Sequence, residues 1–228
     1  MPPALTYWAS AVVPIGNHSV GRTLFALHRA VPSQADVILE LFTEATEWLR
    51  EKNTDQWAKP WPNARMRYEH LLHDIVGGKT WMVSNDDTII GTITVDKEAP
   101  VDFSSNYIWP PELRAESALY VRRTIVRRSH AGLGIRARLL DWATSVATRE
   151  LGTALLRIDV WTDNRELHAY YERQGFTLCE IRDPAELPDY PARALFERRI
   201  NPNDNSRVGV VLIDSAVRTE VPVPRLPL

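Results

Sequence analysis

The sequence predicts a single α/β (α+β) domain in which helices flank a central sheet, with extensions at both ends of the chain. Strand-like and helix-like runs alternate between residues 23 and 200, in the order β-α-α-β-β-β-α-β-α-β-β. Such a mixture buries its apolar faces around a sheet. The chain has 228 residues, 44% hydrophobic and 25% charged, which suits one globular domain. Residues 154–160 are apolar almost throughout, as is typical of a strand buried on both faces.

The first half of this domain is predicted to contain three strands and two helices. Ser33 is the expected N-cap of the first helix, and apolar side chains from Ile38 to Leu49 follow at helical spacing. Gly77 ends the second helix, and a polar turn at residues 85–87 joins two strands into a hairpin. The predicted elements are strand 23–31, helix 33–49, helix 66–76, strand 80–84 and strand 88–96. Residues 1–22 show no sustained period, so we expect an arm that lies on the domain or is disordered.

The second half contains a strand, a glycine-bearing turn and a long helix in direct succession. The turn holds Gly132 and Gly134, and Gly152 ends the helix. The predicted elements are strand 118–126, helix 135–151, strand 154–160, helix 167–174, strand 176–182 and strand 194–200. The Asn-Pro-Asn-Asp-Asn stretch from Asn201 indicates a boundary, so residues 201–228 are expected to form a tail outside the domain.

Charge and hydropathy exclude several classes of protein. A formal net charge of −2 lacks the basic excess of nucleic-acid-binding proteins. No apolar run approaches the roughly 18 residues that span a bilayer, and no Lys or Arg precedes the first apolar residues as in a secretory signal. The single cysteine, Cys179, cannot form an internal disulfide. We therefore expect a cytoplasmic protein without a nucleic-acid or membrane partner.

The turn around Gly132 and Gly134 is suited to binding an anion. Small residues between a strand and a helix let backbone N–H groups approach a phosphate, and the helix N-terminus adds positive partial charge. The glycines could equally serve only a tight turn. No Gly-Lys-Ser/Thr follows, which excludes a P-loop, and the third glycine of a dinucleotide-binding fingerprint is missing.

Residues 126–176 resemble the GNAT (Gcn5-related N-acetyltransferase) superfamily. The family pattern Gln/Arg-x-x-Gly-x-Gly/Ala, followed by Leu-Leu, matches at Gly134 and at Leu139 with its neighbour Leu140. It departs at Ala131, where the family has Gln or Arg, and at Arg136, where the family has a small residue. The pattern Asn-x-x-Ala-x-x-Leu-Tyr-Glu-x-x-Gly-Phe maps onto Asn164, Leu167, Tyr170, Tyr171, Glu172, Gly175 and Phe176.

This resemblance implies a mixed, mostly antiparallel sheet and an acetyl-CoA-dependent N-acetyltransferase. The backbone of Thr124 and Val126 would pair with the pantetheine arm like an added strand. Asn164 would bind the pantetheine or only cap its helix. The pyrophosphate would lie on the N–H groups of the turn, formed by Ala131, Gly132, Leu133, Gly134, Ile135 and Arg136. No metal is expected. The implied acceptor is a small-molecule amine, an amino-acid derivative or antibiotic-like amine, and the chain would be a monomer or homodimer.

Tyr171 is the expected catalytic residue and also contributes to cofactor binding. An amine that attacks a thioester expels a thiolate, which a nearby phenol can protonate. A phenol has a pKa of about 10 and an alkyl thiol about 8.5, so a hydrogen bond must hold the phenol in place. The alternative is a packed aromatic residue beside Tyr170 and Phe176.

The general base stays open among four carboxylates. Glu44, Glu47 and Asp55 belong to the first helix or the loop after it, and each could be a solvated charge. Asp159 lies in an apolar strand, where a lone carboxylate needs a partner. Among other residues that could bind or react, His70 and His73 lack an evident third metal ligand, and Cys179 is expected to be a small core residue.

Two further groups have alternative interpretations. Arg122, Arg123, Arg127 and Arg128 could attract the anionic cofactor or be solvated strand positions. Trp48, Trp57 and Trp61 could be core residues or an aromatic wall for the acceptor. A non-catalytic acyl-CoA-binding module and a transferase for longer acyl chains are the alternative functions.

Overall fold

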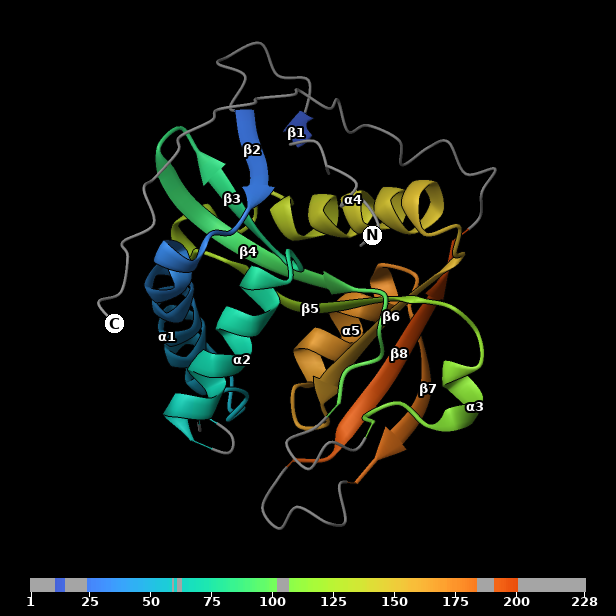
Figure 1. Cartoon of the computed structure of the whole chain (residues 1–228). Helices are drawn as coiled ribbons and strands as arrows, with labels where there is room; N and C mark the ends of the chain where they lie inside the picture. The colour runs from blue at the N-terminus through green and yellow to red at the C-terminus, as the bar shows by residue number, and fades with distance from the viewer. Residues whose placement is uncertain are drawn as a thin grey trace, which may run out of the picture.

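A computed structural model describes residues 11–14, 24–58, 60, 63–101, 107–183 and 191–200, with residues 11–14 described as backbone only (Figure 1). The predicted arm lies outside these ranges except for strand β1 (Ala11–Pro14), which pairs with β2. The predicted tail, residues 201–228, and Trp61 lie outside them altogether.

The centre of the molecule is an eight-stranded sheet in the order β1-β2-β3-β4-β5-β6-β8-β7. Neighbouring strands pair antiparallel except β5 and β6, which are parallel, so the predicted mixed, mostly antiparallel sheet is confirmed. The other strands are β2 (Leu24–Arg29), β3 (Thr80–Asn85), β4 (Thr88–Asp96), β5 (Leu119–Val126), β6 (Leu155–Trp161), β7 (Thr177–Arg182) and β8 (Arg193–Arg199).

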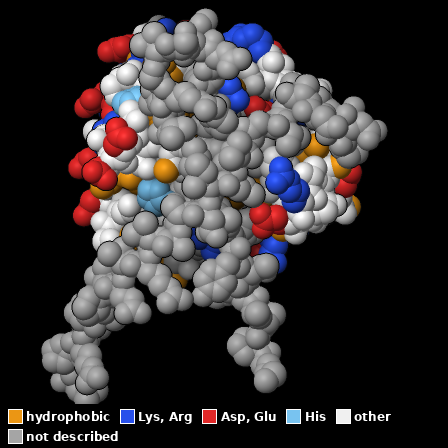
Figure 2. All heavy atoms as spheres, turned by 90° about the horizontal axis from the view of Figure 1, so that it is seen from above, with side chains coloured by type: hydrophobic (Ala, Val, Ile, Leu, Met, Phe, Trp, Pro, Cys, Tyr) orange, Lys and Arg blue, Asp and Glu red, His pale blue; other side chains and the backbone are white. Residues whose placement is uncertain are grey.

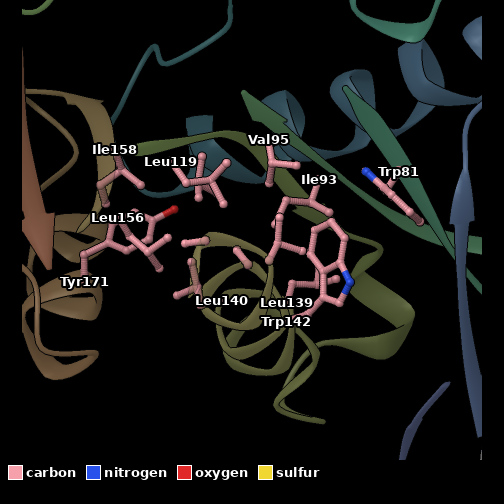
Figure 3. Close-up of a cluster of buried hydrophobic side chains, with 14 of the residues drawn as sticks. Trp81, Ile93, Val95, Leu119, Leu139, Leu140, Trp142, Leu156, Ile158 and Tyr171 are labelled. Carbon is pink, nitrogen blue, oxygen red and sulfur yellow. The ribbon is translucent and has the colours of Figure 1, made fainter. Parts of the chain in front are cut away.

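Helices cover both faces of this sheet (Figure 1). Along β3 the side chains alternate between the faces, because successive residues of a strand point in opposite directions. Trp81 packs edge-on against Trp142 of α4, with ring centroids 5.0 Å apart, whereas Met82 packs in the cluster formed with α1 and α2. Figure 3 shows the α4 side of this core, where strand residues meet Leu139 and Leu140. The helices are α1 (Ala35–Glu51), α2 (Ala64–Val76), α3 (Pro111–Arg114), α4 (Ile135–Glu150) and α5 (Arg165–Arg173).

Strands β5 and β6 pair over only two residues each. Leu119 lies opposite Leu156 and Tyr120 opposite Arg157, although both strands continue beyond these pairs. Past Tyr120, the two strands are therefore not hydrogen-bonded to each other, and the sheet opens between them. This opening positions the site described below.

A bulge in β5 accompanies the opening. Thr92 of β4 faces Ile125, and Thr94 faces Arg122, so β5 carries an extra residue between these pairs. Arg123 adopts a φ of 50° there. A bulge bends its strand and increases the local twist. The bend in β5 therefore accompanies the divergence of this strand from β6.

Two predictions about single residues are wrong. Ser33 does not cap α1, because Pro32 starts a short 3-10 turn that contains Ser33, and the Oε1 atom of Gln34 accepts the Val31 N–H at 3.0 Å instead. Cys179 is exposed rather than in the core. Strand β7, which carries Cys179, lies at the edge of the sheet and pairs only with β8.

The described surface carries both signs of charge. Seen from above, acidic and basic side chains both appear on it (Figure 2), in agreement with the small net charge. None of the helices in the described ranges is long and apolar enough to cross a membrane.

Candidate active site

A cavity of about 680 Å³ lies where β5 and β6 diverge. Its wall is formed by α1 and the loop after it, by both strands, by the turn before α4 and by α5. Of the predicted binding residues, only Leu133 is not part of the wall, and its side chain is exposed. The lining residues from the prediction are Thr124, Val126, Ala131, Gly132, Gly134, Ile135, Arg136, Asn164 and Tyr171.

The turn before α4 requires glycine for its backbone and leaves space in front of it. Gly132 and Gly134 have φ values of 81° and 72°, in the left-handed region that only glycine adopts without strain. A Cβ atom added at either position would meet no atom within 4 Å. The glycines therefore serve the turn, as the plain interpretation requires, and also keep its approach open.

The N-terminus of α4 is not capped by a described side chain. Its N-cap is Gly134, and its first turn contains no acidic residue. The Arg138 N–H donates to the Gly134 carbonyl at 3.2 Å and closes the first turn, so the N–H groups of residues 135–137 have no acceptor within the helix. These groups and the helix dipole favour an anion at the end of the cavity.

Tyr171 is buried on α5, with 6% of its surface exposed, and it lines the cavity. Burial raises the pKa of Tyr171 above its ordinary value, the charge of Asp159 adds to the rise, and the Arg136 cation and a hydrogen bond with the Thr124 side chain oppose it. The ring packs edge-on against Phe176 at 5.5 Å, at one end of the cluster in Figure 3. The residue is thus both a packed aromatic and a phenol that burial keeps protonated.

Asn164 caps α5, as one of its two interpretations predicts. Its Oδ1 atom accepts the Leu167 N–H at 3.2 Å. Its Nδ2 atom donates to Oε1 of Gln56 at 2.5 Å, and both side chains are buried. This contact fastens the loop after α1 to the turn between β6 and α5. Sequence analysis missed Gln56, because a buried pair 108 residues apart leaves no local pattern.

A second contact strengthens this attachment. The Thr54 hydroxyl donates to Oδ2 of Asp163 at 3.0 Å. Lys52 pairs with Glu166 at 3.3 Å on the exposed side. Together with Gln56 and Asn164, these residues hold α1 and α5 on either side of the cavity.

Two of the four candidate carboxylates line the cavity, Glu44 and Asp159. Glu44 accepts hydrogen bonds from the Arg128 N–H at 2.5 Å and from Nη1 of Arg127 at 3.0 Å. Asp159 forms an ion pair with Arg193, which supplies the partner that its apolar strand requires. The side chains of Glu47 and Asp55 are exposed and lie outside this cavity.

The four arginines around β5 act differently from one another. Arg122 pairs with Asp74 at 3.3 Å and with Asp96 at 3.4 Å, and Arg123 also pairs with Asp74. Arg127 pairs with Glu44. These three are ion-paired within the protein, which neither of the two interpretations foresaw. Arg128, the fourth, stacks on Trp48.

Aromatic side chains line the α1 side of the cavity. Trp48 and Trp57 both belong to the wall. The Arg128 guanidinium lies 4.4 Å from the ring centroid of Trp48, and Trp57 packs edge-on against Phe42 at 5.1 Å. Trp57 therefore contributes both to the core and to the cavity wall.

Nothing in the described ranges groups three or more His, Cys, Asp or Glu side chains as metal ligands. His70 and His73 lie exposed on α2. The cavity wall itself offers amide N–H groups, two phenols, carboxylates, arginines, the ammonium of Lys52 and the imidazole of His130.

Comparisons with known proteins find similar sequences and similar folds. A Bacillus subtilis (strain 168) protein named uncharacterized N-acetyltransferase YesJ is 29% identical over 167 residues, which cover 71% of this chain and 86% of that protein. A GNAT-family acetyltransferase from Listeria monocytogenes superposes with a TM-score of 0.61 at 18% identity, over 83% of this chain and 99% of that one. The PaiA N-acetyltransferase from Thermoplasma acidophilum, solved in complex with coenzyme A, gives a TM-score of 0.55 at 17% identity, over 77% of this chain and 98% of that one.

The family assignment follows from the extent of a further match. Residues 42–176, more than half of the chain, match the model of the acetyltransferase (GNAT) family. The chain therefore belongs to the GNAT family of acetyltransferases and is an acyltransferase.

Proposed function

We propose that the protein transfers an acetyl group from acetyl-CoA to the primary amine of a small molecule, by direct attack of the amine. The proposal is carried by the cavity between β5 and β6, whose wall includes both the open N-terminus of α4 and the buried phenol of Tyr171. The helix N-terminus favours a phosphate, and the phenol can give a proton to a thiolate. Coenzyme A contains both groups. The coenzyme A complex of the Thermoplasma protein supports this choice of cofactor.

The residues of the cavity fit coenzyme A. The space in front of residues 132 and 134 lets the turn approach a diphosphate closely. We assign residues 131–136 to this group, with Leu133 contributing its backbone. The edge of β5 that does not pair with β6 leaves the backbone at Thr124 and Val126 to bind the pantetheine amides. A volume of about 680 Å³ also lies within the range of small-molecule sites.

When bound, acetyl-CoA supplies the thioester that the amine attacks. Tyr171 holds a proton at Oη, because burial disfavours the phenolate, and donates it as the thiolate leaves. Asn164 contributes indirectly, because it caps the helix that carries Tyr171. The Gln56–Asn164 hydrogen bond joins the loop after α1 to the N-terminus of the helix that carries Tyr171.

We place the general base at Asp159. Asp159 and Tyr171 line the same cavity. Burial raises the pKa of Tyr171, and the charge of Asp159 adds to this rise. An Asp159→Asn variant should lose turnover near neutral pH and recover part of it at higher pH, where more of the free amine is already deprotonated. The measurement is kcat against pH, with Glu44→Gln as the matched control. Equal pH profiles for Asp159→Asn and the wild type would remove Asp159 from the mechanism.

The wall favours a small amine of low charge as the acceptor. Its described carboxylates are all engaged: Glu44 with Arg127, Asp159 with Arg193 and Glu166 with Lys52. A polycation would therefore find no unpaired acidic side chain in the described lining, whereas Trp48 and Trp57 offer apolar surface.

Thiol release tests the proposed function. Acetyl-CoA is mixed with the protein and a panel of aromatic amines, amino-acid derivatives, aminoglycosides and polyamines. The free thiol of coenzyme A is measured with a chromogenic thiol reagent. We expect amine-dependent release that favours the low-charge members. Absence of amine-dependent release across the panel would contradict the proposal.

A further inference from the structure

Arg136 has a charge of the wrong sign for its position in the helix. It lies in the first turn of α4, where the helix dipole is positive and a cation is disfavoured. The first turns of α1 and α5 follow the usual rule and carry Asp36 and Glu166. No acidic side chain in the first turn of α4 compensates Arg136.

The guanidinium of Arg136 is also without an ionic partner in the part of the chain that the structure describes. It lies over the ring of Tyr170, with Cζ 5.3 Å from the centroid. Its Nε atom is buried there without a hydrogen-bond acceptor, and the Tyr170 hydroxyl is buried without a partner as well. By contrast, Arg122 and Arg123, which also line the cavity, pair with Asp74. A partly buried, unpaired cation beside open amide groups favours an anionic ligand.

The two stacked residues both depart from the family pattern. Arg136 occupies a position that is small in the pattern, and Tyr170 occupies a position that is Leu. A third departure, Ala131, removes a Gln or Arg at the start of the same turn. The chain thus lacks a polar side chain on one side of the turn and has an extra cation on the other.

We propose that Arg136, held in place by stacking on Tyr170, binds the diphosphate of coenzyme A in this protein. The inference rests on the proposed function and adds a side-chain cation to the backbone amides of the turn. A guanidinium can donate two parallel hydrogen bonds to phosphate oxygens. Tyr170 is a positioning residue, because its ring fixes the plane of the guanidinium that Arg136 presents.

Calorimetric titration with coenzyme A tests the role of Arg136. Arg136→Ala should raise Kd by about tenfold, the loss of one charge-assisted contact, and should make Kd less sensitive to salt. Arg138→Ala is the matched control. Arg138 lies on the same helix, is partly buried and lines a separate small cavity near Phe25, so its removal should leave Kd unchanged.

A thermal melt separates this role from a structural one. Without ligand, Arg136→Ala should melt no lower than the wild type, because it removes a cation from a helix N-terminus. With coenzyme A, the stabilising shift in Tm should be smaller than for the wild type. A Kd equal to that of the wild type would overturn the inference, whereas a wild-type protein that binds no coenzyme A would overturn the proposed function itself.

Dephospho-coenzyme A, which lacks the 3′-phosphate, identifies the phosphate concerned. We expect Arg136→Ala to weaken its binding by the same factor as for coenzyme A. If Arg136→Ala and the wild type instead bind dephospho-coenzyme A with the same Kd, Arg136 contacts the 3′-phosphate, and the assignment to the diphosphate is contradicted.

A double-mutant cycle tests the positioning role of Tyr170. When it is introduced into the wild type, Tyr170→Leu should weaken coenzyme A binding. When it is introduced into the Arg136→Ala variant, it should not change Kd further, because the ring acts through the guanidinium. Additive effects of the two changes on Kd would contradict that role.

Discussion

At the scale of single residues, Tyr171 combines core packing with a place in the cavity wall. Core packing fixes the ring, and burial keeps the proton on the oxygen at neutral pH. The fixed ring removes a cost of reorientation, whereas the raised pKa makes the phenol a weaker acid, so its proton moves only as negative charge develops on the sulfur.

Replacing Tyr171 by Phe separates these properties. The ring packing remains, and the proton donor is lost, so kcat should fall by about 10²- to 10⁴-fold. Affinity for acetyl-CoA should change little, because the proton matters as the thiolate develops. The measurement is kcat with an identified amine, beside a melt that checks the fold. Wild-type turnover with a normal melt would leave Tyr171 as a packing residue only.

At the scale of elements, the bulge in β5 depends on a buried carboxylate from another element. Asp74 of α2 pairs with Arg122 at one edge of the bulge and with Arg123 within it. Burial alone would raise the pKa of Asp74, but Arg123 and Arg122 outweigh it and lower this pKa below its ordinary value. The cluster therefore links α2 to the strand that forms one wall of the cavity.

We expect Asp74→Ala to cost about 3–5 kcal/mol of unfolding free energy, because it leaves the buried Arg123 without its carboxylate and Arg122 with Asp96 alone. Urea unfolding measures this loss. Glu69→Ala, which breaks an exposed pair on the same helix, is the control and should change stability little.

The lowered pKa of Asp74 also gives the sign of the pH dependence. The ion pairs of Asp74 contribute fully to the free energy of unfolding above pH 3.9, roughly the pKa of an Asp carboxyl in the unfolded chain. This contribution is lost as the pH falls through the lower pKa that Asp74 has in the folded protein. The wild type should therefore lose stability on acidification below this point, and Asp74→Ala should lose less. Equal urea midpoints for Asp74→Ala and the wild type would contradict the account of the bulge.

The turn before α4 offers a second test at this scale. Gly134→Val should weaken acetyl-CoA binding at least tenfold, about 1.4 kcal/mol, since a side chain there occupies the space in front of the amides. Gly152→Val is a close control. Gly152 has a φ of 62° and equally open surroundings, but it lies past the other end of α4. The Gly152→Val variant should carry the same strain of a side chain at positive φ and should bind acetyl-CoA with an unchanged Kd. An unaltered Kd for Gly134→Val by calorimetry would contradict the phosphate assignment.

How far sequence predicts structure differs from one element to the next. The strand, glycine turn and helix around Gly134 were predictable, because their pattern is local and chemically constrained. The start of the first helix was not predicted correctly, because residues Pro32–Gln34 form a 3-10 turn and Ser33 lies inside this turn instead of capping α1. The exposure of Cys179 depends on the place of β7 in the sheet order, which no local pattern encodes.

At the scale of the whole molecule, the cavity arises from contacts between distant segments. The divergence of β5 from β6 and the Gln56–Asn164 hydrogen bond join residues far apart in the sequence. Composition and periodicity carry no information on such pairs. Most of the predicted binding residues therefore line the cavity, but the structure was needed to find the rest of its wall and to show which charged side chains pair with one another there.

The boundary of the domain is testable at this scale. The Ile200 N–H donates to the Ala154 carbonyl at 2.7 Å, and its side chain packs in the main core. A chain that ends at Asn201 should therefore retain a cooperative melt, and one that ends before Ile200 should be less stable. The measurement is thermal unfolding of both truncations. Loss of the cooperative transition on ending at Asn201 would assign a structural role to residues 202–228.

Acetyl transfer is tested most directly by mass spectrometry of the amine after incubation with acetyl-CoA and the protein. In the same samples, calorimetry confirms that acetyl-CoA binds. The account predicts an amine heavier by one acetyl group, formed in proportion to free coenzyme A and far more slowly by Tyr171→Phe. Tight binding of acetyl-CoA without any acetylated amine across the panel would contradict it and indicate a module that binds the acyl donor without transferring it.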